Sequence, residues 1–440
     1  MDAAKFADTL RAAGVVGCGG AGFPSYAKLV PGAKSIILNC AECEPLLTPH
    51  RQLLAMEAPE IIGALARIAE IIGAPNVVVA VKETFRGAIA AVREEIAGRP
   101  AFRLMELPDV YPMGDEVILV YEATGIALAP GELPSARGIA VINPETALNA
   151  SRAMRHGAGV TDKLVTIAGA VQRPATALLP LGVSFAEAVD ACGGATTPDP
   201  AYISGGAMMG FAAAGSSPVV KTTNAIIVLP SDHKLILRRE TPARTALKRA
   251  AAACCSCSAC ADFCPRALLG HPIRPDAFAR AAFLSDTSDL SVFAGAEFCS
   301  GCGVCEMFAC PQGLSPRAII MEYKSRMRAA GAAADAVPGR GVSPERGLRR
   351  VSEERLTARI GLSEYSGDSP VTALEIKPRR VRLPLRQHIG APSVPTVRPG
   401  ADVTRGQRIA APGPGLSVAL HASVAGRISD VTDNHIVIEG

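Results

Sequence analysis

Short apolar runs alternate with longer amphipathic stretches along the first 160 residues. Three runs rich in β-branched residues, SIILN (35–39), NVVVAV (76–81) and GIAVIN (138–143), predict buried strands. Between the first two, the stretch RQLLAMEAPEIIGALARIAEIIGA (51–74) repeats apolar residues at helical spacing. Strands that alternate with helices are typical of an α/β domain with a parallel sheet, which we place at residues 1–160.

The pattern changes after residue 160. From 161 to 232, two strand-like runs, LVTIAGAV and AIIVLP, flank one helical stretch, SFAEAVDACGG, which indicates a small β-grasp unit. Residues 376–440 combine short strand-like runs with many glycines and prolines. They resemble the barrel-sandwich hybrid fold of lipoyl and biotinyl carriers. Those carriers need a lysine for the swinging arm, and residues 381–440 contain none, so we expect a docking or structural module.

Helical patterns surround two cysteine runs between residues 233 and 331. The next segment is rich in Gly, Ala, Arg and Ser, a composition that favours a partly ordered linker. We therefore expect a multidomain α/β protein with five segments: an α/β domain (1–160), a β-grasp domain (161–232), a ferredoxin-like helical domain that contains the two cysteine runs (233–331), a linker (332–375) and a barrel-sandwich hybrid (376–440).

The two cysteine runs have the spacing of iron–sulfur ligands. The first run is spaced C-x2-C-x2-C-x3-C and the second C-x2-C-x2-C-x4-C, and a proline follows each. In two-cluster ferredoxins the fourth cysteine of a run ligates the other cluster. We therefore predict two [4Fe-4S] clusters with crossed ligands: Cys254, Cys257, Cys260 and Cys310 for one, and Cys299, Cys302, Cys305 and Cys264 for the other.

Structural zinc and disulfide bonds are the alternatives for these cysteines. Paired zinc sites usually have C-x2-C couples separated by a longer loop, which fits two three-cysteine runs poorly. Cys255 is the surplus thiol, because as first ligand it would leave only one residue before Cys257. The N-terminal residues lack the pattern of a signal peptide, so we expect a reducing, cytoplasmic location.

Charge and hydropathy argue against two classes of partner. The net charge is only +4, from 45 basic and 41 acidic residues, which is too balanced for a nucleic-acid binder on charge alone. The uncharged stretch from 200 to 220 is long enough to span a membrane, but its glycines, serines and prolines favour loops and strands. We expect neither nucleic-acid binding nor a membrane span.

A glycine-rich loop lies near the N-terminus, in the sequence GVVGCGGAGFPSYAKL. Gly17, Gly19 and Gly22 satisfy G-x-G-x-x-G, but a helical pattern precedes the loop where a dinucleotide-binding Rossmann motif requires a strand. We interpret it as a bare backbone loop whose N–H groups hold a phosphate, with Lys28 adding positive charge. The alternative is a glycine-rich turn without a ligand.

The loop and three further motifs, LNCAECEP (38–45), GDE (114–116) and INPET (142–146), resemble the flavin domain of the NADH-binding subunit of respiratory complex I. Together with the β-grasp unit, which is similar to SLBB domains, the stretch CPRALLGH and the tail RLPLRQHIGAP, they resemble the RnfC protein of Rnf electron-transport complexes more closely. In that protein the barrel-sandwich hybrid comes first. Here it comes last, as in the PduS family of cobalamin reductases of bacterial microcompartments.

The resemblance implies an FMN site and the residues that form it. Gly17, Gly19, Gly20, Gly22 and Lys28 would lie along the FMN phosphate and ring. Asn39, Glu42 and Glu44 would line the flavin and nicotinamide side. The remaining implied pocket residues are Gly114, Asp115, Glu116, Asn143 and Thr146.

The same resemblance implies the chemistry. NADH gives two electrons as a hydride, iron–sulfur clusters accept one at a time, and FMN can mediate between them, so no amino acid is needed as an acid or base. One hypothesis is an NADH-dependent cobalamin reductase that returns oxidised corrinoid to cob(I)alamin for a corrinoid-dependent enzyme, in a microcompartment whose shell proteins would be partners. The other is a relay to flavodoxin, ferredoxin or a radical-activating enzyme.

Histidines are the residues that could ligate cobalt directly. Four of them, His50, His271, His388 and His421, lie in sequence contexts typical of loops. Nothing else in the chain is specific for a corrinoid. We therefore expect these histidines to be ordinary surface residues rather than cobalt ligands.

Overall fold

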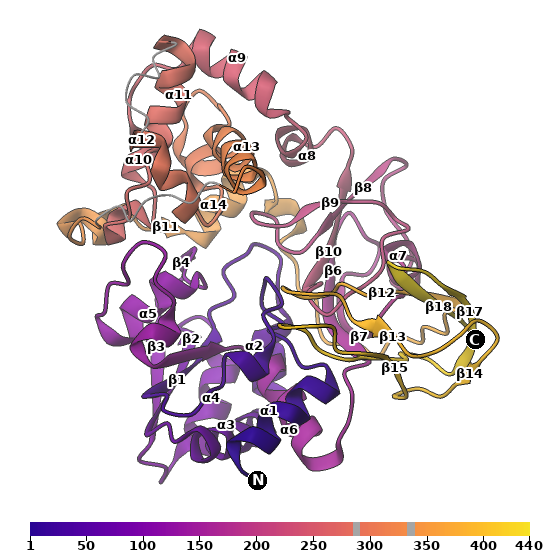
Figure 1. The fold of residues 1–440 in the computed structure, drawn as a ribbon. Coiled ribbons are helices and arrows are strands. Elements are labelled where there is room, and N and C mark those ends of the chain that lie inside the picture. The colour runs from indigo at the N-terminus through magenta and orange to yellow at the C-terminus, as the bar shows by residue number, and fades with distance from the viewer. Residues whose placement is uncertain (285–290, 332–338) are drawn as a thin grey trace.

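The computed structural model describes residues 1–284, 291–331 and 339–440. Figure 1 shows the helical segment at the top, the N-terminal α/β domain below it, and two β-rich domains to one side. Chain order and spatial order differ, because the C-terminal strands return to lie beside residues of the first domain. Arg11 Nε, for example, donates to the Ser417 carbonyl at 3.3 Å.

The N-terminal domain is built on a four-stranded parallel sheet in the order β3-β2-β1-β5. Its central strands are buried on both faces, as is usual when helices cover a parallel sheet. The strands and helices are β1 (Ser35–Cys40), β2 (Asn76–Lys82), β3 (Phe102–Leu107), β4 (Val110–Tyr111), β5 (Ile139–Ile142), α1 (Ala3–Ala13), α2 (Pro49–Met56), α3 (Ala58–Ile72), α4 (Arg86–Ile96), α5 (Glu116–Thr124), α6 (Pro144–His156), η1 (Ser25–Ala27) and η2 (Pro134–Arg137).

The three strands predicted in this domain are present, and two features differ from the prediction. The helical stretch 51–74 is two helices, α2 and α3, which meet at Glu57 just before Pro59. Proline cannot continue a helix from the preceding turn, so it begins a new one. The sequence pattern also gave no signal for β3, an edge strand whose residues are mostly half-buried or exposed.

The second domain has a five-stranded sheet in the order β7-β6-β10-β8-β9. Its central pair, β10 and β6, is parallel, and α7 begins with a capping box in which Ser184 and Glu187 bond to each other's backbone N–H. Both predicted strands and the predicted helix are present. The elements are β6 (Asp162–Gly169), β7 (Ala175–Pro180), α7 (Phe185–Ala191), β8 (Pro200–Ser204), β9 (Phe211–Ala213) and β10 (Ala225–Pro230).

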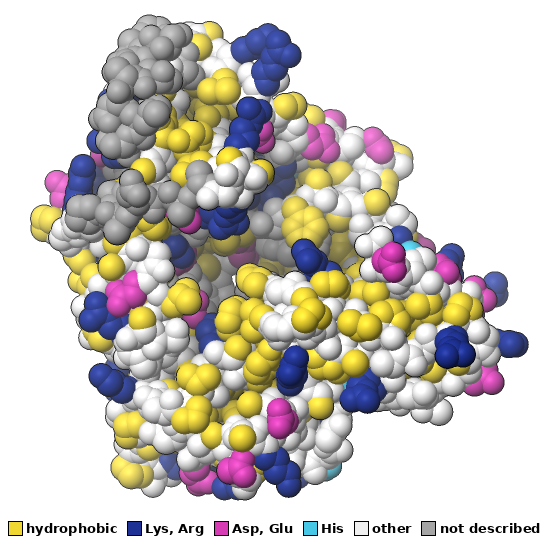
Figure 2. All heavy atoms as spheres, viewed as in Figure 1, with side chains coloured by type: hydrophobic (Ala, Val, Ile, Leu, Met, Phe, Trp, Pro, Cys, Tyr) yellow, Lys and Arg dark blue, Asp and Glu magenta, His cyan; other side chains and the backbone are white. Residues whose placement is uncertain are grey.

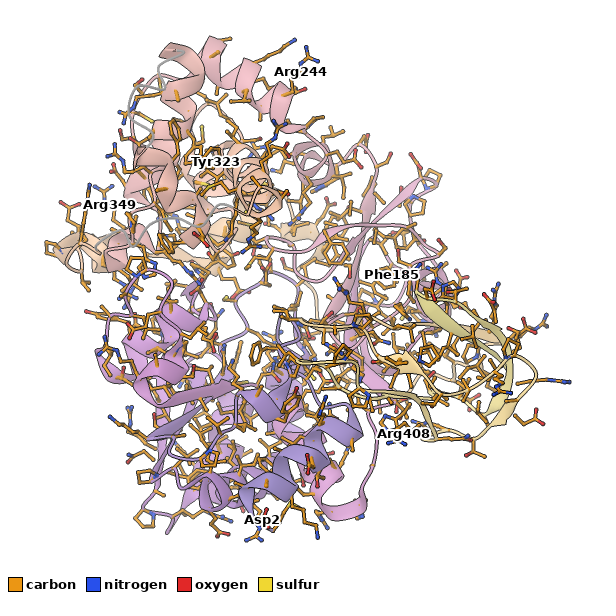
Figure 3. The ribbon with its side chains drawn as sticks, in the orientation of Figure 1. Asp2, Phe185, Arg244, Tyr323, Arg349 and Arg408 are labelled. Carbon is orange, nitrogen blue, oxygen red and sulfur yellow. The ribbon has the colours of Figure 1, made fainter. Side chains whose placement is uncertain are left out.

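The third domain is helical and packs around a small aromatic cluster. Phe278, Phe293 and Tyr323 meet in pairs with ring centroids 4.9–5.8 Å apart, and Tyr323 lies among the helices whereas Arg244 lies at the outer edge (Figure 3). The elements are α8 (Lys234–Arg239), α9 (Ala243–Ala253), α10 (Ala259–Asp262), η3 (Ala267–Leu269), α11 (Pro275–Leu284), α12 (Ser291–Ala294), η4 (Gly295–Phe298), η5 (Cys305–Ala309) and α13 (Pro316–Ala329).

The segment expected to be a partly ordered linker is largely structured where the structure describes it. Strand β11 pairs with β4 of the first domain, and Val351 and Leu356 are buried against it. Farther along, Val371 forms a parallel bridge with Thr176 of the second domain. The elements are η6 (Pro344–Arg349), β11 (Val351–Ser352), α14 (Glu353–Ile360) and η7 (Ser363–Tyr365).

The C-terminal module consists of two small sheets, as a barrel-sandwich hybrid requires. One has the order β12-β18-β17-β14 and the other β13-β15-β16, and all their pairs are antiparallel. Figure 2 shows hydrophobic side chains gathered over the face that these strands form. The strands are β12 (Arg380–Pro384), β13 (Val394–Pro395), β14 (Asp402–Val403), β15 (Arg408–Ala411), β16 (Leu420–His421), β17 (Gly426–Val431) and β18 (His435–Glu439).

The described helices do not include one with the length and apolar character needed to cross a bilayer. On the face drawn in Figure 2, lysine and arginine side chains are interspersed with aspartate and glutamate.

Candidate functional site

The glycine-rich loop is closed at its base and anchored to α6. Val16 and Pro24 form an isolated antiparallel bridge, and Gly17 N–H donates to the Phe23 carbonyl at 2.9 Å. Cys18 N–H donates to Thr146 Oγ1 at 3.0 Å. The tip of the loop, residues 19–21, therefore projects from a fixed base beside the N-terminus of α6.

A cavity of about 240 Å³ lies against this loop. The cavity lies at the carboxyl ends of β1 and β5, which are neighbours in the sheet. From β1 the chain continues to β2 on one side of β1, whereas β5 pairs with the opposite side of β1. The position between β1 and β5 is therefore the topological switch point of the sheet. Ligands of open parallel sheets bind at that point. Ten of the thirteen predicted cofactor-binding residues line the cavity: Gly17, Gly19, Gly20, Gly22, Lys28, Asn39, Gly114, Glu116, Asn143 and Thr146.

Hydrogen bonds fix the polar side chains of this cavity. Asn143 caps α6 by accepting from Thr146 N–H at 2.9 Å, and Asn39 Nδ2 donates to the Gly114 carbonyl at 3.0 Å. Lys28 Nζ lies 2.6 Å from Glu116 Oε1. A bare backbone loop, one lysine and a helix N-terminus are the groups that bind a phosphate, so the residues present fit the FMN phosphate.

The glycines of the loop differ in what an added Cβ atom would contact. A Cβ on Gly19 would collide with Asn143 Nδ2, and one on Gly22, which has φ +71°, would press on Thr222 and on the backbone of residues 387–388. A Cβ on Gly20 would meet nothing within 4 Å. Gly20 thus leaves room that the protein itself does not use.

Two predicted carboxylates, Glu42 and Glu44, do not line the cavity. Glu42 accepts from the N–H groups of His50 and Arg51 at 2.6 and 2.8 Å, at the start of α2. Glu44 accepts from Met208 and Met209 N–H at 2.6 and 3.0 Å in the second domain. Burial raises the pKa of Glu44, and these N–H donors oppose the rise. Each carboxylate accepts hydrogen bonds from two backbone N–H groups outside the cavity.

The third, Asp115, is turned toward the helical domain. It caps α5 by accepting from Val117 N–H at 3.0 Å, and its two oxygens accept from Arg266 Nε and Nη2 at 3.0 and 3.1 Å. Sequence reasoning missed Arg266, although its place two residues after Cys264 was a usable signal. Tyr111, which donates to the Cys302 carbonyl at 2.7 Å, gave no signal.

Four of the predicted cluster cysteines share one cavity in the helical domain. Cys264 of the first run lines it together with Cys299, Cys302 and Cys305 of the second run. This is the set expected from crossed ligation. Arg266 and Arg317 also line it, so positive charge lies beside the place where a negatively charged thiolate cluster would sit.

The other four predicted cluster cysteines line a second cavity. Cys254, Cys257 and Cys260 come from the first run and Cys310 from the second. Cys255 also lines this cavity, and Cys255 and Cys257 are exposed to solvent whereas Cys264, Cys302 and Cys305 are buried. The two cavities thus divide the eight predicted ligands into two sets of four, with Cys255 as a fifth thiol in the second cavity, which lies nearer the surface.

The chemistry of these thiols suits a cluster. All thirteen cysteines are free, and within the described ranges no three His, Cys, Asp or Glu side chains converge on a point that one metal ion could occupy. Burial raises the pKa of Cys302 and of Cys260 to about 12. Iron must therefore displace protons from buried thiols, which couples cluster insertion to pH.

The four histidines are not surface residues. His50, His271, His388 and His421 are all buried, with 3–7% of their surface exposed, so the expectation from sequence was wrong. Packing explains their positions: His271 Nε2 lies 3.0 Å from the Leu128 carbonyl, and His388 Nδ1 lies 3.0 Å from the Ile389 carbonyl. None of the four lines the glycine-loop cavity or the two cysteine cavities.

Four known domain families match this chain. The Nuo51 FMN-binding domain matches residues 10–152, the SLBB domain 164–212, the 4Fe-4S dicluster domain 253–315 and the RnfC barrel-sandwich hybrid domain 361–439. The chain therefore contains an FMN-binding domain and a [4Fe-4S] dicluster domain. The predicted fold class and cofactors are confirmed.

A solved structure shares the fold over much of the chain. It is an NAD+-reducing [NiFe]-hydrogenase in its H2-reduced state, with a TM-score of 0.50 over 76% of this chain and 63% of that one, at 17% identity. Among curated proteins, the RnfC-type component of the Na(+)-translocating ferredoxin:NAD(+) oxidoreductase complex of Acetobacterium woodii is 31% identical over 60% of this chain and 58% of the relative.

Full-length relatives have the same domain order as this chain. The cobalamin reductase PduS of Citrobacter freundii is 39% identical over 99% of this chain and 97% of the relative. The cobalamin reductase PduS of Salmonella typhimurium is 39% identical over 100% of this chain and 97% of the relative. Because the identity extends through all four domains and both cysteine runs, this chain belongs to the PduS cobalamin reductase family.

Proposed function

We propose that this chain is an NADH-dependent cobalamin reductase that uses FMN and two [4Fe-4S] clusters to return cob(III)alamin and cob(II)alamin to cob(I)alamin. The observation that carries the proposal is the full-length 39% identity to two cobalamin reductases. The cavity at the switch point and the two four-cysteine cavities support it, because one chain holds sites for a two-electron and a one-electron cofactor.

The chain's own residues bind and orient the flavin. The N–H groups of Gly19, Gly20 and Ala21 are free of large side chains near the loop tip, and Lys28, which pairs with Glu116, places an ammonium beside the loop where a phosphate would bind. Asn39 and Asn143 are locked by their own hydrogen bonds, so they present fixed amide groups to the ring. Bound FMN supplies the ability to take a hydride from NADH and pass electrons on singly.

The thiols of the helical domain bind the clusters and separate them. Cys264 and Cys310 each cross to the other run, so neither cavity is complete without both runs. Crossing holds the two cysteine segments at a fixed separation. Cluster potential would then be set by burial, neighbouring charge and hydrogen bonds to sulfur.

A relay function is the second candidate, favoured by a specific observation. Sixty per cent of the chain is 31% identical to a component of a ferredoxin:NAD(+) oxidoreductase complex. The exposure of Cys257 supports a cluster site near the surface, where a flavodoxin, a ferredoxin or a radical-activating enzyme could accept electrons. From the similarity to the PduS relatives we also propose that the protein is located in a bacterial microcompartment and contacts its shell proteins.

Trapping of the product tests the proposal. The reconstituted protein is mixed with NADH and hydroxocobalamin without oxygen, and cob(I)alamin is captured with an alkylating agent. We expect trapping that depends on NADH, on bound FMN and on the cluster cysteines. Free flavins can reduce cob(III)alamin without the protein, so reduction of cob(III)alamin to cob(II)alamin alone is no test. If no cob(I)alamin is trapped while flavodoxin or a radical-activating enzyme is reduced rapidly, the relay function is correct and the reductase function is wrong.

Co-purification tests the location. The tagged chain is expressed together with a shell operon from an organism that encodes it, and intact compartments are isolated. We expect the protein in the compartment fraction, and recovery only in the unencapsulated fraction would contradict this part of the proposal.

A further inference from the structure

One short segment of the flavin-binding domain lies between the flavin cavity and a cysteine cavity. In the segment 111–116, Gly114 and Glu116 line the glycine-loop cavity. Tyr111 and Asp115 face the other way: the Tyr111 hydroxyl donates to the Cys302 carbonyl, and Asp115 binds Arg266. Residues that alternate along one segment therefore contact both sites.

The contact through Asp115 is bidentate and largely shielded from solvent. The Asp115 and Arg266 side chains are 6% and 21% exposed, and the pair is bidentate. Arg266 also lines the cavity of Cys264, Cys299, Cys302 and Cys305, and its Nη1 donates to the Phe298 carbonyl at 3.2 Å. Planar bidentate pairs fix orientation as well as distance.

The second cysteine cavity has no such connection among the described residues. All those that line it lie between residues 254 and 316, in the helical domain. Its outer side is exposed at Cys255 and Cys257. The two cluster sites are thus unequal. One is bonded to the flavin-binding domain through Tyr111 and Asp115, and the other is lined by residues of the helical domain and is open to solvent at Cys255 and Cys257.

We propose that Asp115 and Arg266 are positioning residues that hold the Cys264–Cys299–Cys302–Cys305 cluster against the flavin, so that this cluster receives electrons first and the Cys254–Cys257–Cys260–Cys310 cluster is the outlet. The inference rests on the proposed binding of FMN and NADH. FMN bound at the glycine-loop cavity and reduced by one hydride would release two electrons singly and one proton to solvent. Both electrons would enter at the Cys264–Cys299–Cys302–Cys305 site, and the first would move on to the Cys254–Cys257–Cys260–Cys310 site before the second follows.

Asp115→Asn tests the pair with little risk to the fold. Asparagine caps helices as well as aspartate does, so α5 should keep its start, while the charge on one partner is removed. We expect unchanged FMN and iron content and unchanged reduction of the flavin by NADH. Transfer from flavin to the clusters, followed as bleaching of the cluster absorbance in anaerobic stopped flow, should slow by about tenfold or more, since charge-assisted bidentate bonds hold the interface.

Glu122→Gln is the matched control. Glu122 lies on the same helix, α5, and binds Arg346 and Arg350 of η6 and the residue after it, away from the flavin and cysteine cavities. It should transfer electrons at the wild-type rate. A wild-type rate in Asp115→Asn, or equal slowing in Glu122→Gln, would overturn the assignment of the pair.

Redox titration followed by EPR gives a readout independent of turnover. Arg266→Gln removes a positive charge beside one cysteine cavity only, so it should lower the potential of that cluster and leave the other unchanged, because reduction adds negative charge. Arg266→Lys should restore most of the potential but not the rate. Equal shifts in both clusters would overturn the proposed order. If wild-type flavin were not reduced by NADH, the proposed function would fail instead, and no corrinoid is present to confuse the two outcomes.

Discussion

At the scale of single residues, Gly20 separates ligand binding from folding. Gly19 and Gly22 are required by the protein's own packing, since a Cβ at either would strike neighbouring atoms. Gly20 lines the flavin cavity and has open space around it. A side chain at position 20 therefore interferes with whatever occupies the cavity and not with the chain.

We expect Gly20→Val to fold with its clusters and to lose FMN. The valine would occupy space that a phosphate needs beside the bare backbone. Flavin absorbance per chain after desalting measures the loss, and the melting temperature of the apoprotein should match that of apo wild type. Gly19→Val should lose flavin and also unfold more easily because of Asn143. Full flavin content in Gly20→Val would support the alternative interpretation, in which the loop is a glycine-rich turn that binds no ligand.

The second prediction for single residues follows from crossed ligation, in which the fourth cysteine of each run ligates the cluster of the other run. Cys264→Ser should change the EPR signal of the cluster built on Cys299, Cys302 and Cys305, because the structure places Cys264 in their cavity. Cys255→Ser, the matched control in the same run, should leave about eight irons per chain and both signals intact, as expected for two four-iron clusters. A change confined to the cluster of the first run would contradict crossed ligation.

The positions of cysteines and glycines could be predicted from their spacing in the sequence, whereas the hydrogen-bond partners of the carboxylates could not. The cysteine sets followed from the spacing of two runs, and the glycines followed from the absence of side chains. Glu42, Glu44 and Asp115 lie in motifs next to true pocket residues, yet each accepts hydrogen bonds from backbone or arginine outside its own motif. Such partners become visible only when the domains are assembled.

At the scale of elements, the β11–α14 segment is held to the first domain by a buried amine. Lys82, which is fully buried, lies between Asp109, 2.6 Å away, and Glu353 at the start of α14. Burial opposes the charge on Lys82, but Glu353 and Asp109 outweigh it and raise the Lys82 pKa. The ion pair therefore joins α14, which follows the helical domain in the chain, to β2 in the sheet of the N-terminal domain.

We expect Glu353→Gln to loosen β11 and α14. Removing one partner of a buried ammonium costs about 1–3 kcal/mol, and Asp109 compensates part of that. Faster amide hydrogen exchange in residues 351–360 would show it. Arg349→Gln, which breaks an exposed pair with Glu345 in the same segment, should leave the exchange unchanged. Equal protection in both variants would mean that hydrophobic contacts alone hold the segment.

Strong local patterns predicted elements, and weak ones did not. The central strands β1, β2 and β10 are continuous apolar runs and were predicted within a residue or two. Strand β3 alternates irregularly at an edge, and α14 is only eight residues long with two buried side chains. Its place depends on Lys82, which lies 271 residues earlier in the chain, so composition alone suggested a linker.

At the scale of the whole molecule, one lysine joins three domains. Lys221 belongs to the second domain, and its Nζ donates to the Gly14 carbonyl of the first at 2.8 Å and to the Ala419 carbonyl of the C-terminal module at 3.0 Å. The side chain is fully buried, and its hydrogen-bond acceptors are neutral carbonyls. Burial lowers its pKa from 10.5 to about 7. Near neutrality this junction therefore holds an amine that gives up its proton easily.

Lys221 makes stability depend on pH in a defined direction. Between about pH 7 and the unfolded value of 10.5, the unfolded chain binds a proton that the folded chain has released. Raising the pH through this window therefore favours the folded state, and the full penalty applies below the folded pKa. From about pH 7 to 9 the contribution amounts to about 2 kcal/mol, at about 1.36 kcal/mol per unit.

We expect the stability difference between wild type and Lys221→Met to shift toward wild type by that amount between pH 7 and 9. Methionine leaves the same two carbonyls unpaired at both pH values, so their cost cancels in the comparison, as do all other titrating groups. Denaturant unfolding of the two proteins at each pH, with FMN and clusters bound, measures the shift. A difference that stays constant, or one that shrinks as the pH rises, would show that the amine remains protonated in the folded protein and that the three-domain junction holds a charge.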